Sequence, residues 1–119
     1  MTKGGELNGF LDAGSLVIGT IRFQDTLRVD GKVQGKIESH NDLVVGDKGE
    51  VEGEVSVGIL YVSGTVRGRV KAEQKVVVHR GGRLLSDITT PALIIEEGGV
   101  FEGSCDMVRE KAGGIKQIG

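Results

Sequence analysis

The sequence predicts an all-β fold, a single-stranded parallel β-helix (solenoid) of about six coils with about 17 residues each, from three observations. Segments such as LRVDGKVQGKI, residues 27–37, alternate aliphatic and polar residues, as a strand with one buried face does. The alternation returns in LVVGDKGEVEGEV and LYVSGTVRGRV, with no helical segment between the copies. Glycine recurs within and beside each copy, where short strands must bend.

Two motifs define the repeat. The first is an aliphatic pair, L-x-V, whose successive copies are 16, 17, 16 and 17 residues apart, and it occurs at Leu27/Val29, Leu43/Val45, Leu60/Val62, Val76/Val78 and Leu93/Ile95. The second is V-x-G-x-I, and its copies begin at Val17, Val33, Val51, Val66, Leu84 and Phe101. Propeller blades need about 40 residues, and hairpins would need recurrent Asn-Gly or Asp-Gly turns. We therefore expect a β-helix over residues 14–107, a short flexible segment over 1–13 and a flexible tail over 108–119.

Stacking the copies in register predicts four inward columns without a charged residue, in a chain of which 27% is charged. The columns are Leu27-Leu43-Leu60-Val76-Leu93, Val29-Val45-Val62-Val78-Ile95, Val33-Val51-Val66-Leu84-Phe101 and Ile37-Val55-Val70-Ile88-Cys105. One outward column, Lys36-Glu54-Arg69-Asp87, alternates in sign at the ~4.8 Å spacing of adjacent strands. This ladder either helps to fix the register of the coils or is an ordinary mixed surface.

Composition narrows the class of protein. The 15 basic and 17 acidic side chains nearly balance, which argues against binding to nucleic acid or membranes through overall charge. Cys105 is the only cysteine, so an intramolecular disulfide is impossible and a reducing cytosol is the expected compartment. The chain has neither a run of about 18 apolar residues nor the apolar core of a signal peptide at its start. We expect a cytoplasmic protein.

The segment FLDAGSLVIGTIRFQDTLRVDGKVQGKIES, residues 10–39, followed by short V-x-G-x-V coils, closely resembles the bactofilins, which are bacterial cytoskeletal proteins. The resemblance extends over about residues 10–106, and GTIRFQDTLRVDGKVQGKI is its most specific part. It implies a right-handed β-helix that assembles without nucleotide into non-polar filaments, with head-to-head and tail-to-tail contacts. Such filaments act as scaffolds at the inner face of the cytoplasmic membrane, in cell shape, polarity or the localisation of cell-wall or polarity proteins. Members commonly begin with a membrane-targeting segment, whereas MTKGGEL here has no hydrophobic or basic anchor.

Catalytic chemistry has little support in the sequence. His40 and His79 lie about two repeats apart, and neither has a second histidine or a cysteine close in sequence. The three-histidine zinc site of left-handed β-helix enzymes needs one histidine more, and the period of six of hexapeptide acyltransferases breaks after Val57. We expect a non-enzyme with no catalytic residue, metal or cofactor; a trimeric, acyltransferase-like enzyme is the alternative. Cys105 is expected to be a small buried hydrophobic residue.

A basic segment, residues 67–83, offers a second candidate surface. Its cationic side chains are Arg67, Arg69, Lys71, Lys75, Arg80 and Arg83, opposed only by Glu73. Lateral contact between filaments or plain solvation is the favoured interpretation, and the alternative is an adaptor that binds anionic lipid or DNA. Because aromatic stacking residues are absent from the segment, we do not expect it to bind nucleic acid directly.

The two ends of the β-helix carry the strongest functional prediction. A parallel β-helix exposes unpaired backbone groups and an open core at each end, and the tail that follows the last coil is too rich in glycine for a firm helical cap. We predict a polymerisation contact at the C-terminal end through Phe101, with Val100 and Met107 beside it. Phe10, Leu11 and Val17 are predicted to form the opposite contact, with Phe10 and Leu11 in a partial first coil rather than in a lid or a membrane-touching segment.

Overall fold

The computed structural model describes residues 9–107 and builds them entirely from β-strands and turns. The strands are β1 (Gly9–Leu11), β2 (Leu16–Arg22), β3 (Leu27–Val29), β4 (Lys32–Glu38), β5 (Asp42–Val45), β6 (Glu50–Val62), β7 (Thr65–Val78), β8 (Arg83–Thr89), β9 (Leu93–Ile95), β10 (Val100–Glu102) and β11 (Cys105–Asp106). All strand pairings are parallel. The predicted all-β solenoid is therefore confirmed.

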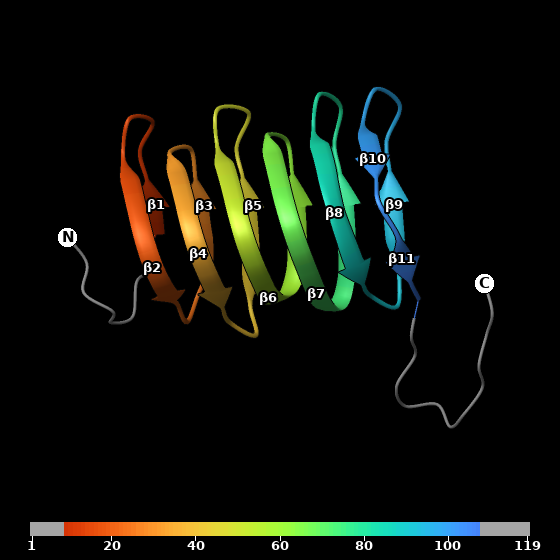
Figure 1. Cartoon of the computed structure of the whole chain (residues 1–119), viewed down its shortest axis with the longest axis horizontal. Helices are drawn as coiled ribbons and strands as arrows, with labels where there is room; N and C mark the ends of the chain where they lie inside the picture. Colours follow the sequence, from red (N-terminus) through yellow and green to blue (C-terminus); the bar gives the residue numbers. More distant parts are fainter. Residues whose placement is uncertain (1–8, 108–119) are drawn as a thin grey trace.

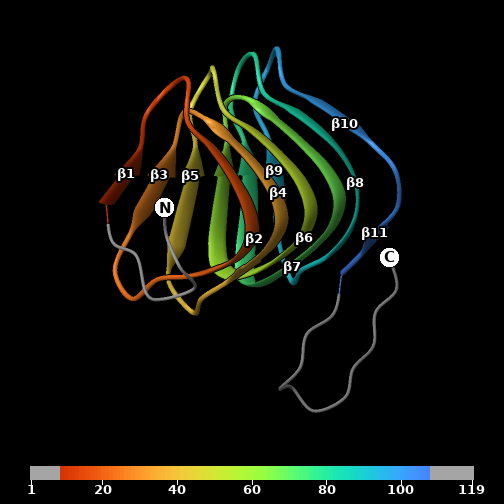
Figure 2. The same ribbon diagram turned by 60° about the vertical axis from the view of Figure 1, so that its left-hand side comes forward.

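The chain winds into six coils that stack along one axis (Figure 1). Each coil rises through a short segment (β1, β3, β5, the end of β6, the end of β7 or β9), crosses a turn and descends, while the chain advances from left to right in that view. This path is a right-handed coil, which is also clear in the view closer to the axis (Figure 2). We number the coils by residue range as the first (9–22), second (27–38), third (42–56), fourth (59–71), fifth (75–89) and sixth (93–106).

The strand register reproduces the four predicted inward columns. Leu27 pairs with Leu43, Leu43 with Leu60, Leu60 with Val76, and Val76 with Leu93. The column of Val33 likewise ends at Phe101, and that of Ile37 ends at Cys105. In the second to fifth coils, every member of these columns is 2% exposed or less, so the columns form one continuous aliphatic core.

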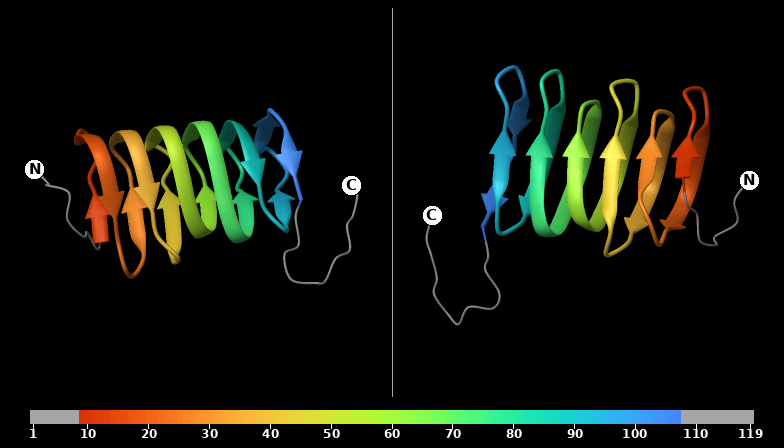
Figure 3. Two further views of the ribbon diagram at one scale, coloured as in Figure 1. Left: turned by 60° about the horizontal axis from the view of Figure 1, so that its bottom comes forward. Right: turned by 180° about the vertical axis from the view of Figure 1, so that it is seen from behind.

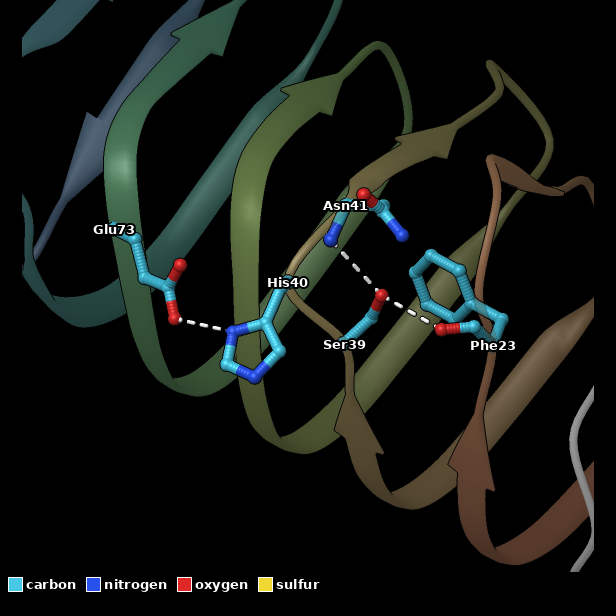
Figure 4. A network of polar contacts seen from close by, with 5 residues as sticks. All are labelled: Phe23, Ser39, His40, Asn41 and Glu73. Atoms are coloured by element: carbon cyan, nitrogen blue, oxygen red, sulfur yellow. Dashed lines mark hydrogen bonds and ion pairs between the residues drawn. The ribbon is translucent and has the colours of Figure 1, made fainter.

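A fifth inward column, at the corner after β2, β4 and β8, was not predicted. Its members are Phe23, Ser39, Val57, Ala72, Thr90 and Met107. The Ser39 hydroxyl donates a hydrogen bond to the Phe23 carbonyl at 2.8 Å and accepts one from the Asn41 amide at 3.0 Å (Figure 4). Because this column mixes aromatic, polar and small side chains, no alternation of residue types marks it in the sequence.

Glycines occupy one bend position in five of the six coils. Gly35 and Gly53 pair in register and have φ values of 137° and 131°, a region that favours glycine. A Cβ atom added to Gly53 would lie 1.9 Å from the carbonyl oxygen of Gly35 in the coil below. Ser86 takes this place in the fifth coil, where its buried hydroxyl donates to the Val66 carbonyl at 3.1 Å. The bend therefore depends on both conformational freedom and close approach of the coils.

The predicted charge ladder is aligned in register, since Lys36 pairs with Glu54, Glu54 with Arg69 and Arg69 with Asp87. Within residues 9–107, however, no ion pair shorter than 4.0 Å joins these side chains. Neighbouring rows make such pairs instead, Lys32 with Glu50 at 3.7 Å and Arg67 with Glu52 at 3.8 Å. These pairs are exposed, so each contributes only about 0–1 kcal/mol to stability.

Candidate functional site at the two ends of the solenoid

At the N-terminal end, the first coil leaves part of the core uncovered. β1 pairs only with β3, and β2 only with β4, so one edge of each strand has no partner strand within residues 9–107. Leu11 and Val17 pack against the core but are only half-buried, because no other coil among residues 9–107 covers them on this side. We call these two side chains, with the free edges of β1 and β2, the first-coil face.

Phe10, the third residue predicted at this end, lies on the outer surface of the first coil and is 56% exposed. Its neighbours Leu11 and Gly9 pair with β3, which places residues 9–11 in the first coil although the predicted β-helix begins at residue 14. Leu16 and Ile18 are also exposed on the outside of this coil. The sequence analysis did not select them. Both are apolar residues at positions that are polar in the next copy of the repeat, and this exception could have identified them. The expected flexible segments 1–8 and 108–119 lie outside the described residues.

At the C-terminal end, all five inward columns stop at an apolar side chain that is partly exposed. The last members are Leu93, Ile95, Phe101, Cys105 and Met107, with Ile95 44% and Met107 46% exposed. β9 pairs only with β7, and β10 and β11 only with β8, so this edge is also free in the part of the chain that the structure describes. We call these five side chains, with the free edges of β9, β10 and β11, the last-coil face.

The structure brings two of the three predicted C-terminal residues onto this face. Phe101 ends the column of Val33, and Met107 ends the corner column. Val100 differs, because it pairs with the exposed Arg83 and therefore belongs to the outer surface beside the face. The sequence analysis did not select Leu93 and Ile95, although each is the last member of a predicted inward column and could have been identified as an end residue for that reason.

Cys105, expected to be a small buried hydrophobic residue, packs against the core but is only half-buried. It does lie on the predicted inward column beyond Ile88, but no further coil among residues 9–107 covers it. Partial burial raises the pKa of its thiol above the ordinary value, and the negative charge of the adjacent Asp106 raises that pKa further. The neutral thiol is therefore favoured, which suits packing better than nucleophilic chemistry.

The predicted basic surface does not form one patch. Arg67 and Arg69 are exposed on opposite sides of the bend at Gly68, and Arg80 lies in the turn after β7. The other members are Lys71, Lys75 and Arg83, and the set follows the chain around the fourth and fifth coils rather than covering one side. A flat lipid surface or a DNA groove contacts one side of a rigid body, so few of these cations could act together.

Both histidines lie in turns and interact with carboxylates. His40 Nδ1 lies 2.8 Å from a carboxylate oxygen of Glu73, and His79 Nδ1 lies 3.1 Å from Glu96 (Figure 4 shows the first pair). Among residues 9–107, no group of three or more His, Cys, Asp or Glu side chains is arranged to hold a metal ion. The described residues also contain no helix that could cross a membrane.

Residues 9–107 thus form a right-handed β-solenoid whose aliphatic core ends, in both its first and its last coil, in partly exposed apolar side chains. Comparison with known families matches residues 9–106 to the bactofilins, described as polymer-forming cytoskeletal proteins. The chain belongs to the bactofilin family. Members of this family have a structural role, and the description implies that they self-associate.

Two curated relatives come from Myxococcus xanthus (strain DK1622). Bactofilin BacP is 36% identical over 92 residues, which are 77% of this chain and 38% of BacP. Bactofilin BacO is 30% identical over 100 residues, which are 84% of this chain and 79% of BacO. The matched region thus spans well under half of BacP and about four fifths of BacO. No solved structure matches the chain significantly.

Proposed function

We propose that the chain polymerises end to end through its first-coil and last-coil faces, without nucleotide, and that the filaments act as a non-enzymatic scaffold. The observation that carries this proposal is the last-coil face, where five columns of the core stop at partly exposed apolar side chains. Covering such surface contributes about 25 cal/mol per Å² of apolar area removed from water. Both the core and the strand edges are therefore favourable places for another copy.

The coils inside one chain provide the physical template for the contact between chains. Each coil adds backbone hydrogen bonds to the free edge of the preceding coil and covers its exposed core, and a second chain can do the same. This process needs no nucleotide hydrolysis, because burial of apolar surface and strand pairing drive it. Membership of a polymer-forming family supports this role. The same proposal includes three cellular roles. The filaments support cell shape or polarity, they localise cell-wall or polarity proteins, and they lie at the inner face of the membrane.

The substitution Phe101→Arg tests the last-coil face. It places a charge at the end of a core column, so we expect folded protein that no longer forms filaments by electron microscopy. Ser56→Arg is the matched control, because it adds the same charge at an exposed position in the third coil, away from both ends. Filaments of normal length from Phe101→Arg, alongside a β-rich circular dichroism spectrum, would exclude this face as the contact.

Cys105 tests the direction of assembly, because it is the only cysteine and lies on the last-coil face. Contacts between two last-coil faces bring two Cys105 thiols together, whereas head-to-tail contacts leave each thiol opposite a first coil that has none. We expect a short bismaleimide cross-linker to convert filaments into covalent dimers and no larger species. Absence of dimers from intact filaments would contradict the tail-to-tail arrangement.

A further inference from the structure

One outer side of the solenoid carries an apolar column that the end-to-end contact does not use. The rising segments of the six coils lie side by side as a flat sheet on this side (Figure 3, right). Their outward residues pair in register from the first coil to the sixth. We call this column the outer stripe, and its members are Phe10, Arg28, Val44, Tyr61, Val77 and Ile94.

Five of the six outer-stripe residues are apolar or aromatic, which is unusual for an outward row. Tyr61 stacks on His79, with ring centroids 5.8 Å apart and ring planes 4° from parallel. Val77 is only 6% exposed between Tyr61 and Ile94, while Ile94 itself is 46% exposed. Arg28 interrupts the stripe, but Asp30 binds its guanidinium group at 2.9 Å and balances its charge. The stripe is thus a flat and packed surface rather than a set of loose side chains.

The row beside the stripe contains two charged side chains that have no ion-pair partner in the part of the chain that the structure describes. Asp42 in the third coil pairs in register with Ile59, and Ile59 pairs with Lys75 in the fifth coil. Within residues 9–107, neither Asp42 nor Lys75 has an ion-pair partner within 4.0 Å. An acidic and a basic group therefore lie one coil on either side of Ile59.

This spacing matches a second copy of the chain facing the stripe with its axis reversed. A two-fold axis along the strands at the fourth coil places the third coil of one copy opposite the fifth coil of the other. Asp42 then faces Lys75 of the other copy, twice, while Tyr61 and Val44 face Tyr61 and Val77 of the other copy. A parallel arrangement would place Lys75 opposite His79 and Asp42 opposite Gly46, which satisfies neither charge.

We propose that the outer stripe is a lateral contact between antiparallel copies of this chain, so that filaments pair side by side. The inference rests on the proposed end-to-end polymerisation, because the flat face is only about 10 Å by 25 Å, given three residues per strand and six coils. One such contact buries far less than the roughly 1,200 Å² of a stable complex. Many contacts along two filaments act together, so pairing follows filament formation.

Charge exchange tests the pairing in filaments of the full chain. Asp42→Lys and Lys75→Asp each place like charges opposite one another in the antiparallel arrangement, so we expect single filaments from either variant by cryo-electron microscopy. The double variant Asp42→Lys/Lys75→Asp restores opposite charges and is expected to restore paired filaments. Lys36→Asp, an exposed charge reversal on another side of the solenoid, should leave pairing unchanged. Circular dichroism establishes that each variant is folded.

A second measurement reports the contact itself. Filaments assembled from mixed ¹⁴N and ¹⁵N protein and treated with a carbodiimide should yield heavy–light peptides that join Asp42 to Lys75. Wild-type filaments that are always single, or a double variant that stays unpaired, would overturn the lateral contact while leaving end-to-end assembly intact. Filaments that remain single in solution but lie along phosphatidylglycerol vesicles would show that lipid covers the stripe, and would also overturn it. Absence of any filament would overturn the proposed function as well.

Discussion

The central and terminal coils of this solenoid have nearly the same local structure but different surroundings. Leu60 and Leu93 occupy the same column, yet Leu60 is fully buried and Leu93 is only half-buried. Gly53 and Gly19 have φ values within one degree of each other, yet only at Gly53 does a neighbouring carbonyl occupy the place of a Cβ atom. What differs is the presence of a coil on the open side. In the proposed assembly, the contact sites therefore arise from the position of a coil at the end of the described solenoid rather than from special residues.

Alanine substitution of the glycines at the bend should give the largest difference in stability loss between a central and a terminal coil. Gly53→Ala introduces strain of about 1–3 kcal/mol from its positive φ, and overlap with the second coil adds about 1–3 kcal/mol. Gly19→Ala carries the strain alone, because nothing lies within 4 Å of the added carbon. Urea unfolding of both variants in a Phe101→Arg background measures the difference. Equal losses would mean that φ alone determines the requirement for glycine.

Truncating leucines of one core column should give the next largest difference in stability loss between a central and a terminal coil. Leu60→Ala leaves a cavity between two coils and should lower the free energy of unfolding by about 2–5 kcal/mol. Leu93→Ala removes a half-exposed side chain and should cost about 1–2 kcal/mol. Thermal unfolding of monomeric protein provides both values. In protein that can assemble, we expect the opposite order for filament formation, with a larger defect in Leu93→Ala than in Leu60→Ala. A larger assembly defect in Leu60→Ala would contradict this comparison.

The two end coils differ in charge, and the dependence of assembly on salt concentration should reveal this difference. The sixth coil contains Glu96, Glu97, Glu102 and Asp106 and no basic residue, whereas the first coil balances Asp12 with Arg22. Two facing last-coil faces therefore repel, and raising salt from about 0.05 M to about 0.5 M should screen this repulsion. We expect several-fold more Cys105-linked dimer at the higher salt. The variant Glu97→Gln/Glu102→Gln should weaken the dependence, and an unchanged dependence would place these carboxylates away from the contact.

The smallest effect concerns the reactivity of Cys105 in monomeric protein. Because burial and Asp106 raise its pKa, the reactive thiolate is scarcer at a given pH than in an unfolded chain. Alkylation by iodoacetamide, followed by mass spectrometry, should be slower than in urea near pH 8, and its rate should rise at higher pH than that of a free thiol. Asp106→Asn should move the profile toward lower pH. A profile identical to that of the unfolded chain would argue against packing of this side chain at the end face.

Most of the fold was predictable because parallel stacking repeats one pattern. The column of Val33 could be identified as far as Phe101 by spacing alone, since every member is apolar and two residues from the bend. The corner column could not, because Phe23, Ser39 and Thr90 share neither size nor polarity, and hydrogen bonds rather than residue type accommodate the polar members. For β1 the sequence predicts only a partial first coil at Phe10 and Leu11, because three residues are too few to show the repeat.

The candidate site was only partly predictable for a related reason. Phe101 was selected for its size, whereas Leu93 and Ile95 look like any other core residues until the last coil is known to be last. Lys36 and Glu54 were aligned correctly, but whether long side chains meet depends on rotamers that spacing does not determine. The outer stripe escaped notice because Arg28 breaks its pattern in the sequence.

The direction of the inter-coil hydrogen bonds has a mechanical consequence. Strands run across the solenoid, so their hydrogen bonds point along its axis, and tension along a filament loads all the bonds of one coil at the same time. Within a chain, the backbone also passes from each coil to the next and acts as a tether if those bonds rupture. Junctions between chains have no tether. An overstretched filament should therefore fracture between subunits and release intact solenoids, each ready to rejoin.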